Sequence, residues 1–132
     1  MLQYLRSTNS DSIISPQENL QSGSWVRCER PSDEEVSQLL TLGLDEDLIS
    51  DALDPHEVPR IEFDDEWTYL IARLPDTDDD FNDFTTPILF CINKDHIVTL
   101  SRDSLGRLWQ PFIDKVRIRT DRQVELLVAM VE

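Results

Sequence analysis

Three aspartates near the middle of the chain have a spacing that suits a cation site. Asp47, Asp51 and Asp54 fall at i, i+4 and i+7 on a short predicted helix that begins at Asp45, so their carboxylates would share one face. Like charges at this spacing cost about 0.2–0.5 kcal/mol per pair unless a cation lies between them. Hard divalent ions such as Mg²⁺ take oxygen ligands and keep several waters, so a partial carboxylate site is chemically sensible. The residues alone nevertheless favour a plainer interpretation, in which the three side chains form a solvated polar face.

A second acidic group matches a calcium-binding loop only in part. Asp76, Asp78 and Asp80 fit the first three ligand positions of the helix–loop–helix calcium pattern. The glycine and the bidentate glutamate that this pattern requires are replaced by Phe81 and Pro87. Both replacements fall at decisive positions, so the sequence favours a solvated loop between two strands over a calcium site.

The remaining reactive side chains form no catalytic arrangement at the level of sequence. Ser101 and Ser104 lack the G-x-S-x-G frame of a nucleophile elbow. His56 and His96 lie in unrelated segments without metal-ligand spacing, and the 3 glycines are not clustered into a phosphate-binding loop. The sequence therefore predicts that the chain is not an enzyme.

The two cysteines, Cys28 and Cys91, each lie inside an apolar run typical of a strand. Neither has a C-x-x-C partner, which favours two reduced thiols in the core. A disulfide or a metal-binding pair is the alternative interpretation.

Length and charge limit the class of protein. The 132 residues suffice for one domain, and 27 acidic against 12 basic residues give a net charge of −15. Such a chain would repel phosphates, so nucleic acid is not an expected partner, whereas metal ions or basic protein surfaces are. The chain lacks 18 consecutive apolar residues and an apolar secretory leader, so we expect a soluble cytoplasmic protein or the cytoplasmic part of a larger one.

The elements that must position these residues alternate short strands with helices. Apolar and alternating runs predict strands at residues 2–6, 24–30, 60–63, 67–74, 87–92 and 96–100. Helical spacing predicts helices at residues 32–43, 45–53, 105–116 and 121–132, and polar runs predict loops at residues 7–19 and 75–83. The strands of 60–74 and of 87–100 are connected too tightly for crossovers and must pair antiparallel. We therefore expect an α/β fold of the α+β type, with a mixed, largely antiparallel sheet packed against helices.

Two capping boxes mark predicted helix starts. Ser32 and Glu35 have the S-x-x-E spacing in which each side chain bonds the other residue's backbone N–H, and Gly43 suits the end of the same helix. Thr120 and Gln123 offer a second box, which would open the last helix.

The segment ISDALDPHEVPRIEF, residues 49–63, resembles the most recognisable part of the N-terminal domain of CorA-type magnesium and cobalt channels. In that family, a helix with an acidic-D-x-L core leads through a short linker to a strand of the pattern Pro-Arg/Lys-hydrophobic-Glu. Two further segments are similar in order and spacing, namely SWVRCERP at residues 24–31 and ILFCINKDHIVTL at residues 88–100. The resemblance covers essentially all of residues 1–132.

The resemblance implies that residues 1–132 are a single regulatory domain with an α/β/α sandwich fold, at the cytoplasmic face of the cell membrane. The domain would be a fragment of a longer homopentameric channel, which continues into a stalk and two membrane helices. The resemblance also implies a regulatory ligand, Mg²⁺ or else Co²⁺ or another divalent cation. In the family, such ions bind between neighbouring cytoplasmic domains and hold the pore closed.

The carboxylate that matches the family's interface ligand is Asp51. Ser50 stands where the family often has a glutamate, so the resemblance does not extend to a second intersubunit site. Asp47 and Asp54 would strengthen the local negative field, so all three aspartates are candidate metal ligands. A different class is also compatible with the charge, namely an acidic interaction module that docks a basic protein partner through residues 76–83.

Overall fold

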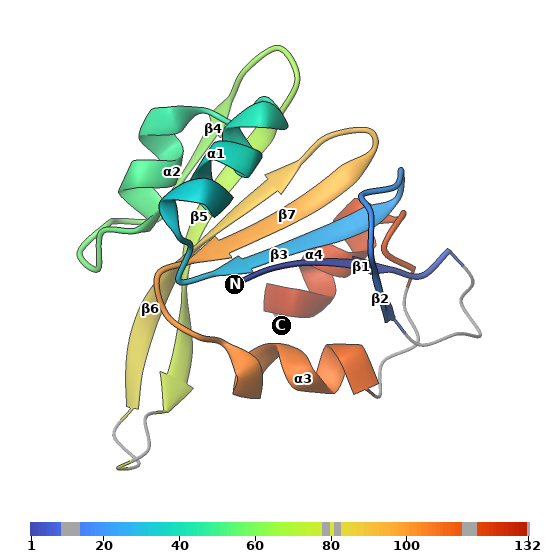
Figure 1. Ribbon diagram of the computed structural model, residues 1–132. Coiled ribbons are helices and arrows are strands. Elements are labelled where there is room, and N and C mark those ends of the chain that lie inside the picture. Colours follow the sequence, from blue (N-terminus) through green and yellow to red (C-terminus); the bar gives the residue numbers. More distant parts are fainter. Residues whose placement is uncertain (9–13, 78–79, 81–82, 115–118, 132) are drawn as a thin grey trace.

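The computed structural model describes residues 1–8, 14–77, 80, 83–114 and 119–131, and in them one seven-stranded sheet has the order β2-β1-β3-β7-β6-β5-β4 (Figure 1). The strands are β1 (Leu2–Arg6), β2 (Ser15–Gln17), β3 (Ser24–Glu29), β4 (Arg60–Phe63), β5 (Thr68–Thr77), β6 (Asp83–Ile92) and β7 (His96–Ser101). The helices are α1 (Asp33–Thr41), α2 (Glu46–Ala52), α3 (Gly106–Asp114) and α4 (Gln123–Val131). β3 pairs with β7 in parallel, and the other described pairings are antiparallel. The predicted mixed, largely antiparallel sheet is confirmed.

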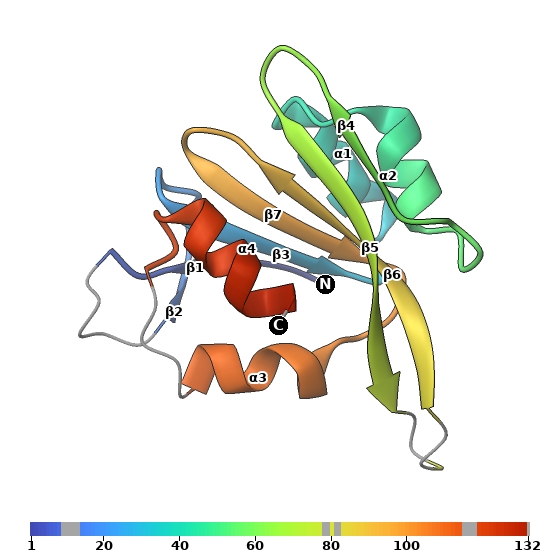
Figure 2. The same ribbon diagram turned by 180° about the vertical axis from the view of Figure 1, so that it is seen from behind.

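Both faces of the sheet are buried, because alternate side chains of the central strands point to opposite sides. One core cluster lies under α1 and α2 and includes Val26, Tyr69, Leu89, Val98, Leu39 and Ile49. The other lies under α3 and α4 and includes Trp25, Phe90, Ile97, Trp109 and Leu126. Figures 1 and 2, seen from opposite sides, show the two helix pairs on the two sides of the sheet. The predicted α/β/α sandwich is therefore confirmed.

The ends of α1 follow the predicted caps, and the structure shows the cap of α2 as well. The capping box is present, since Ser32 Oγ accepts from the Glu35 N–H at 3.2 Å and Glu35 Oε1 accepts from the Ser32 N–H at 3.0 Å. Gly43 follows the last turn of α1 with a φ of 94°, the left-handed conformation that ends many helices. Asp45 is the N-cap of α2, and its Oδ1 accepts from the Leu48 N–H at 3.1 Å.

The hairpin of β5 and β6 is longer than predicted. Residues 75–77 and 83 belong to its strands, with Thr77 opposite Asp83, so the predicted loop over residues 75–83 is wrong at these positions. The far end of the β5–β6 hairpin projects beyond the helices into solvent (Figure 1). Its residues therefore need no alternation of apolar and polar side chains, which is the pattern that predicts where a strand ends. Asp76 consequently lies in a strand, and the candidate calcium ligand Asp78 lies outside the described residues.

Two features of the chain ends also differ from the predictions. β2 forms within the predicted loop over residues 7–19 and pairs with β1. The predicted capping box of Thr120 and Gln123 is wrong, because the buried Thr120 Oγ1 instead accepts from the Ser7 N–H at 2.8 Å and donates to the Gly23 carbonyl at 2.5 Å. α4 accordingly begins at Gln123.

Candidate functional site

Asp51 lies in the last turn of α2, where the helix approaches the outermost strand, β4. Its carboxylate oxygen Oδ2 forms an ion pair with Nη2 of Arg60, the first residue of β4. The Asp51 side chain remains 40% exposed, so it is available to a further partner from outside the chain.

Arg60 gathers three carboxylates around one guanidinium group. Besides Asp51, Nη1 of Arg60 bonds to Oε1 of Glu57, and Nε lies 3.7 Å from Oε2 of Glu62. The hydrogen bond with Asp51 is the main reason that the pKa of Arg60 is raised still further above its ordinary value. Three negative charges against one positive charge leave this group, which we call the Arg60 carboxylate group, with a formal excess of two negative charges.

The linker between α2 and β4 is held in place by a second arginine. Arg73 Nη1 donates to the carbonyl oxygens of Pro55 and Glu57, both at 3.0 Å. Its Nε and Nη2 donate to the side chain and the carbonyl of Thr85 at 3.0 and 2.9 Å, which ties the linker to β5 and β6. The register of β4 on β5, with Arg60 opposite Ile71, then directs Arg60 toward the α2 side of the sheet. The Arg60 carboxylate group is therefore positioned from both α2 and the sheet.

The structure does not join all three predicted aspartates on one helix face. Asp47 is exposed on α2, one turn before Asp51, but α2 ends at Ala52 and is capped by Leu53. Asp54 therefore lies beyond the helix, where its Oδ1 accepts from the His56 N–H at 2.9 Å in a tight turn. Among the described residues, no three His, Cys, Asp or Glu side chains form a group that could hold a metal ion. Their role as ligands stays a prediction, and the side chains of this chain supply at most part of a site.

An exposed apolar edge adjoins the Arg60 carboxylate group. Val58, Ile61 and Phe63 are 63%, 59% and 73% exposed. Ile61 and Phe63 alternate along β4 with Arg60 and Glu62, so they point to the opposite side of this edge strand. Large apolar side chains gathered on an open sheet edge are typical of a surface that another protein surface covers.

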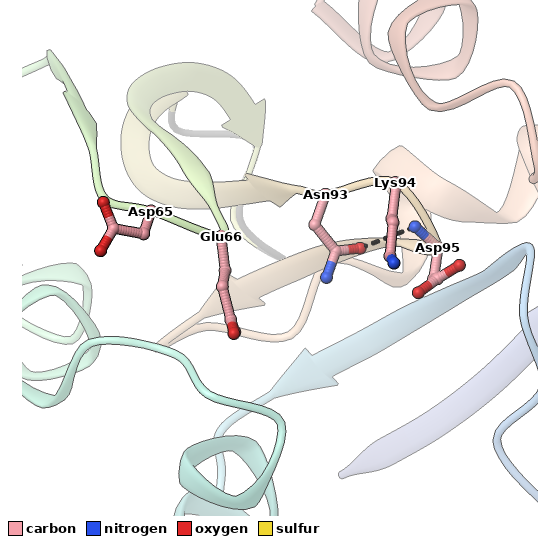
Figure 3. Close-up of a pocket in the computed structure, with 5 residues that line it drawn as sticks. All are labelled: Asp65, Glu66, Asn93, Lys94 and Asp95. Atoms are coloured by element: carbon pink, nitrogen blue, oxygen red, sulfur yellow. Dashed lines mark hydrogen bonds between the residues drawn. The ribbon is translucent and has the colours of Figure 1, made fainter.

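A cavity lies away from these residues, at the end of the sheet where two hairpin turns lie close together (Figure 3). Its volume is about 560 Å³, and it is lined by Asp65, Glu66, Asn93, Lys94 and Asp95. Asn93 Oδ1 accepts from the Asp95 N–H at 2.9 Å, which shapes the turn between β6 and β7. Lys94 offsets part of the acidic charge of the lining, and the cavity includes none of the predicted site residues.

The cysteines and histidines belong to the structure of the core and its loops. Cys28 and Cys91 are fully buried free thiols of the core cluster under α1 and α2, as predicted. Burial raises the pKa of Cys28 to about 12 and that of Cys91 well above its usual value, so neither is a thiolate at neutral pH. His56 is exposed in the α2–β4 linker, and burial lowers the pKa of the half-buried His96.

Known proteins share this architecture, and a known family matches most of the chain. Residues 21–131 match the family of CorA-like Mg²⁺ transporter proteins. The chain belongs to this family. Its members are transporters, so the predicted family and the prediction that the chain is not an enzyme are both confirmed. No helix in the described part of the chain is long and apolar enough to cross a membrane.

The CorA protein of the archaeon Methanocaldococcus jannaschii provides a sequence match and two structural matches. Its cobalt/magnesium transport protein CorA is 30% identical over 88 residues, which are 64% of this chain and 27% of that protein. The structure of the soluble domain of that CorA aligns with 99% of this chain and 54% of its own, with a TM-score of 0.76 and 21% identity. The complete CorA structure aligns with 99% of this chain and 43% of its own, with a TM-score of 0.70 and 21% identity. The chain thus spans about half or less of the CorA proteins that it matches.

The sequence interpretation missed the two arginines that organise the site. In the sequence, Arg60 stands out only as part of the Pro-Arg-hydrophobic-Glu strand pattern, and Arg73 belongs to no motif. A usable signal existed for Arg60, because it lies between two glutamates, Glu57 and Glu62, in a short segment. No comparable signal existed for Arg73, whose acceptors are the carbonyl oxygens of Pro55, Glu57 and Thr85 and the Thr85 hydroxyl, none of them close in the sequence.

Proposed function

We propose that this chain is the divalent-cation-sensing regulatory domain of a CorA-like magnesium and cobalt transporter. In the full-length homopentamer, the domain would lie at the cytoplasmic face of the cell membrane, with stalk and membrane helices supplied by the remainder of the protein. Family membership favours this function over an acidic module that docks a basic partner. The observation that carries the proposal is the placement of Asp51, a partly exposed carboxylate in a group with excess negative charge, next to an edge strand whose opposite side carries exposed apolar side chains.

The sensing mechanism follows from electrostatics at a subunit boundary. Asp51 contributes one carboxylate, and the neighbouring subunit contributes others, so the arrangement is repulsive without a cation. Mg²⁺, or Co²⁺ in its place, bridges the carboxylates and holds the subunits in the closed arrangement. When Mg²⁺ falls, the repulsion returns and the domains separate. The ion shifts this equilibrium because it binds one arrangement better than the other.

Asp47 and Asp54 act in this proposal through the local field. Asp47 is one turn from Asp51 and exposed, so it adds negative potential where the ion arrives. Asp54 is engaged by the backbone of its own turn and contributes less. This order of importance, Asp51 before Asp47 and Asp47 before Asp54, is itself testable.

The test is flux through the reconstituted full-length transporter as a function of internal Mg²⁺. Asp51→Asn keeps the size of the side chain but removes its charge, and we expect inhibition to require roughly tenfold more Mg²⁺, or to be lost, because even supporting residues of metal sites contribute about 10–100-fold to affinity. Asp47→Asn is the matched control and should shift the inhibition curve much less. Overlapping curves for Asp51→Asn and the wild type would remove Asp51 from the sensor.

A second measurement tests whether the site is shared between subunits. The isolated 132-residue chain should bind Mg²⁺ only weakly in calorimetry, because it would supply part of the ligand set. Tight binding of one ion per chain would contradict the shared site and would require a complete set of ligands within one domain.

A further inference from the structure

The Arg60 carboxylate group already holds a cation, namely the guanidinium of Arg60. The guanidinium contacts Asp51, which is the proposed metal ligand, and two further carboxylates, those of Glu57 and Glu62. A divalent ion that binds Asp51 Oδ2 must therefore share or displace the Nη2 hydrogen bond of Arg60. The guanidinium of Arg60 and the divalent ion thus compete for Asp51 Oδ2.

The contacts of Arg60 have the character of a reversible ion pair. Its side chain is 29% exposed and that of Asp51 is 40% exposed, so water reaches both groups. Exposed pairs contribute little to stability, because solvation and side-chain entropy offset most of the Coulomb attraction. The guanidinium sits at the end of a flexible side chain and has two further carboxylates to which it can turn. Release of Asp51 alone therefore costs little and leaves Arg60 neutralised.

We propose that Arg60 is an internal competitor for the divalent cation at Asp51, which occupies the carboxylate when the ion is scarce and is displaced toward Glu57 and Glu62 when the ion is plentiful. The inference rests on the proposed function, in which Asp51 is a cation ligand. Its consequence is regulatory: the strength of the Arg60–Asp51 pair sets the concentration range in which the domain responds. The pair also links the end of α2 to β4 in the absence of metal, since Arg60 belongs to β4 and Asp51 to α2.

The expected effect follows from competition. The apparent dissociation constant for the ion equals the intrinsic one multiplied by one plus the equilibrium constant of the Arg60–Asp51 pair. A partly exposed pair of this kind, which water still reaches, favours its bonded form by at most about fivefold. Arg60→Gln should therefore tighten Mg²⁺ binding by roughly two- to sixfold. If Arg60 instead oriented Asp51 for the ion, the same substitution would weaken binding.

The test is an NMR titration of the ¹⁵N-labelled 132-residue chain with Mg²⁺ alone, at constant ionic strength. Amide shifts in α2 and β4 report the affinity, and the Nε–H signal of Arg60 reports release of Asp51. We expect the Arg60 signal in the wild type to move with the same midpoint as the α2 amides, and Arg60→Gln to bind two- to sixfold more tightly. Arg119→Gln is the matched control. It removes the same charge from a similarly part-exposed pair with Asp121 and should change the affinity by less than twofold.

The remaining outcomes separate the inference from the function on which it rests. Shifts that vanish in Asp51→Asn but are equal or weaker in Arg60→Gln overturn the competitor role and leave Asp51 as a ligand. If the amide shifts caused by Mg²⁺ persist in Asp51→Asn, Asp51 is not the ligand and Arg60 is not its competitor. Shifts that are absent from every variant, including Arg60→Gln, overturn the inference, while the flux of the full-length transporter decides the proposed function separately.

Discussion

Replacing Glu29 by Gln should destabilise the fold strongly, although it removes only one charge. Glu29 ends β3 and is 2% exposed, and it forms an ion pair with Arg27, which is 7% exposed. Its Oε1 also accepts from the Leu105 N–H at 2.7 Å, just before α3 begins. The pair therefore connects an inner strand of the sheet with the start of a helix on one of its faces.

The magnitude follows from the charge that the substitution leaves behind. Gln keeps the volume of Glu and an oxygen that can still accept from Leu105, so the main loss is the neutralisation of Arg27. At the 3.2 Å between Arg27 Nη2 and Glu29 Oε1, the Coulomb attraction is about 5 kcal/mol at an effective dielectric constant of about 20. Removing one partner of a buried pair typically costs about 3–5 kcal/mol, and we expect Glu29→Gln to fall in this range. That is a large part of the roughly 5–15 kcal/mol that holds an ordinary domain together.

Urea unfolding followed by tryptophan fluorescence measures this loss, since Trp25, Trp67 and Trp109 are all buried. A loss of about 4 kcal/mol lowers the midpoint by roughly 2 M if the slope is about 2 kcal/mol/M.

The control and a double variant make the prediction refutable. Glu125→Gln makes the same chemical change in an exposed pair with Arg122 and should cost less than about 1 kcal/mol. Arg27→Met combined with Glu29→Gln removes both buried charges and should recover part of the stability lost in Glu29→Gln. If Glu29→Gln were no more destabilising than Glu125→Gln, neutralisation of the buried Arg27 by Glu29 would not be needed for the stability of the fold.

Three further predictions concern stability, thiol reactivity and pH. Thr120→Val should cost about 1–3 kcal/mol in thermal unfolding, because a buried amide loses its acceptor, whereas Thr41→Val on the exposed side of α1 should cost less than half as much. Cys28 and Cys91 should react with a thiol reagent at pH 8 only after urea unfolds the chain, since burial raises both pKa values, and rapid reaction of the native chain would contradict the buried placement. Backbone N–H groups lower the pKa of Asp64, so its stabilisation is present above the unfolded pKa of about 3.9 and is lost as the pH falls through the lower folded value. In that pH window, Asp64→Asn should flatten the dependence of the unfolding free energy on pH, and an unchanged slope would assign the dependence to other groups.

Local signals in the sequence were sufficient for most of the fold. The capping box of Ser32 and Glu35 and the glycine at 43 formed as predicted, because each depends on neighbours within a few residues. The hairpins were also predictable, since short connections leave antiparallel pairing as the only arrangement. The family was recognisable from residues 49–63 for a related reason: the order of helix, linker and strand is written in adjacent residues.

The sequence was less informative wherever a polar side chain had a choice of partners. Thr120 fits a local cap, yet its hydroxyl bonds to Ser7 and Gly23, about a hundred residues away, where burial makes an unpaired amide costly. Spacing likewise placed Asp54 on a helix face with Asp51, but the helix ends first and Asp54 caps a turn.

The composition and pattern of this chain thus determine its charge, its strands and helices, its two-faced sheet and its family, because these depend on local periodicity and on summed properties. The environment of Asp51 depends instead on how α2 packs on the inner strands of the sheet, next to the edge strand β4. That packing brings Arg60, nine residues further along the chain, onto the carboxylate and leaves the edge of the sheet exposed. An ion pair across two elements has no sequence period, since its geometry depends on how both elements lie on the shared core. The pairing of Asp51 with the guanidinium of Arg60 is consequently decided by the tertiary structure.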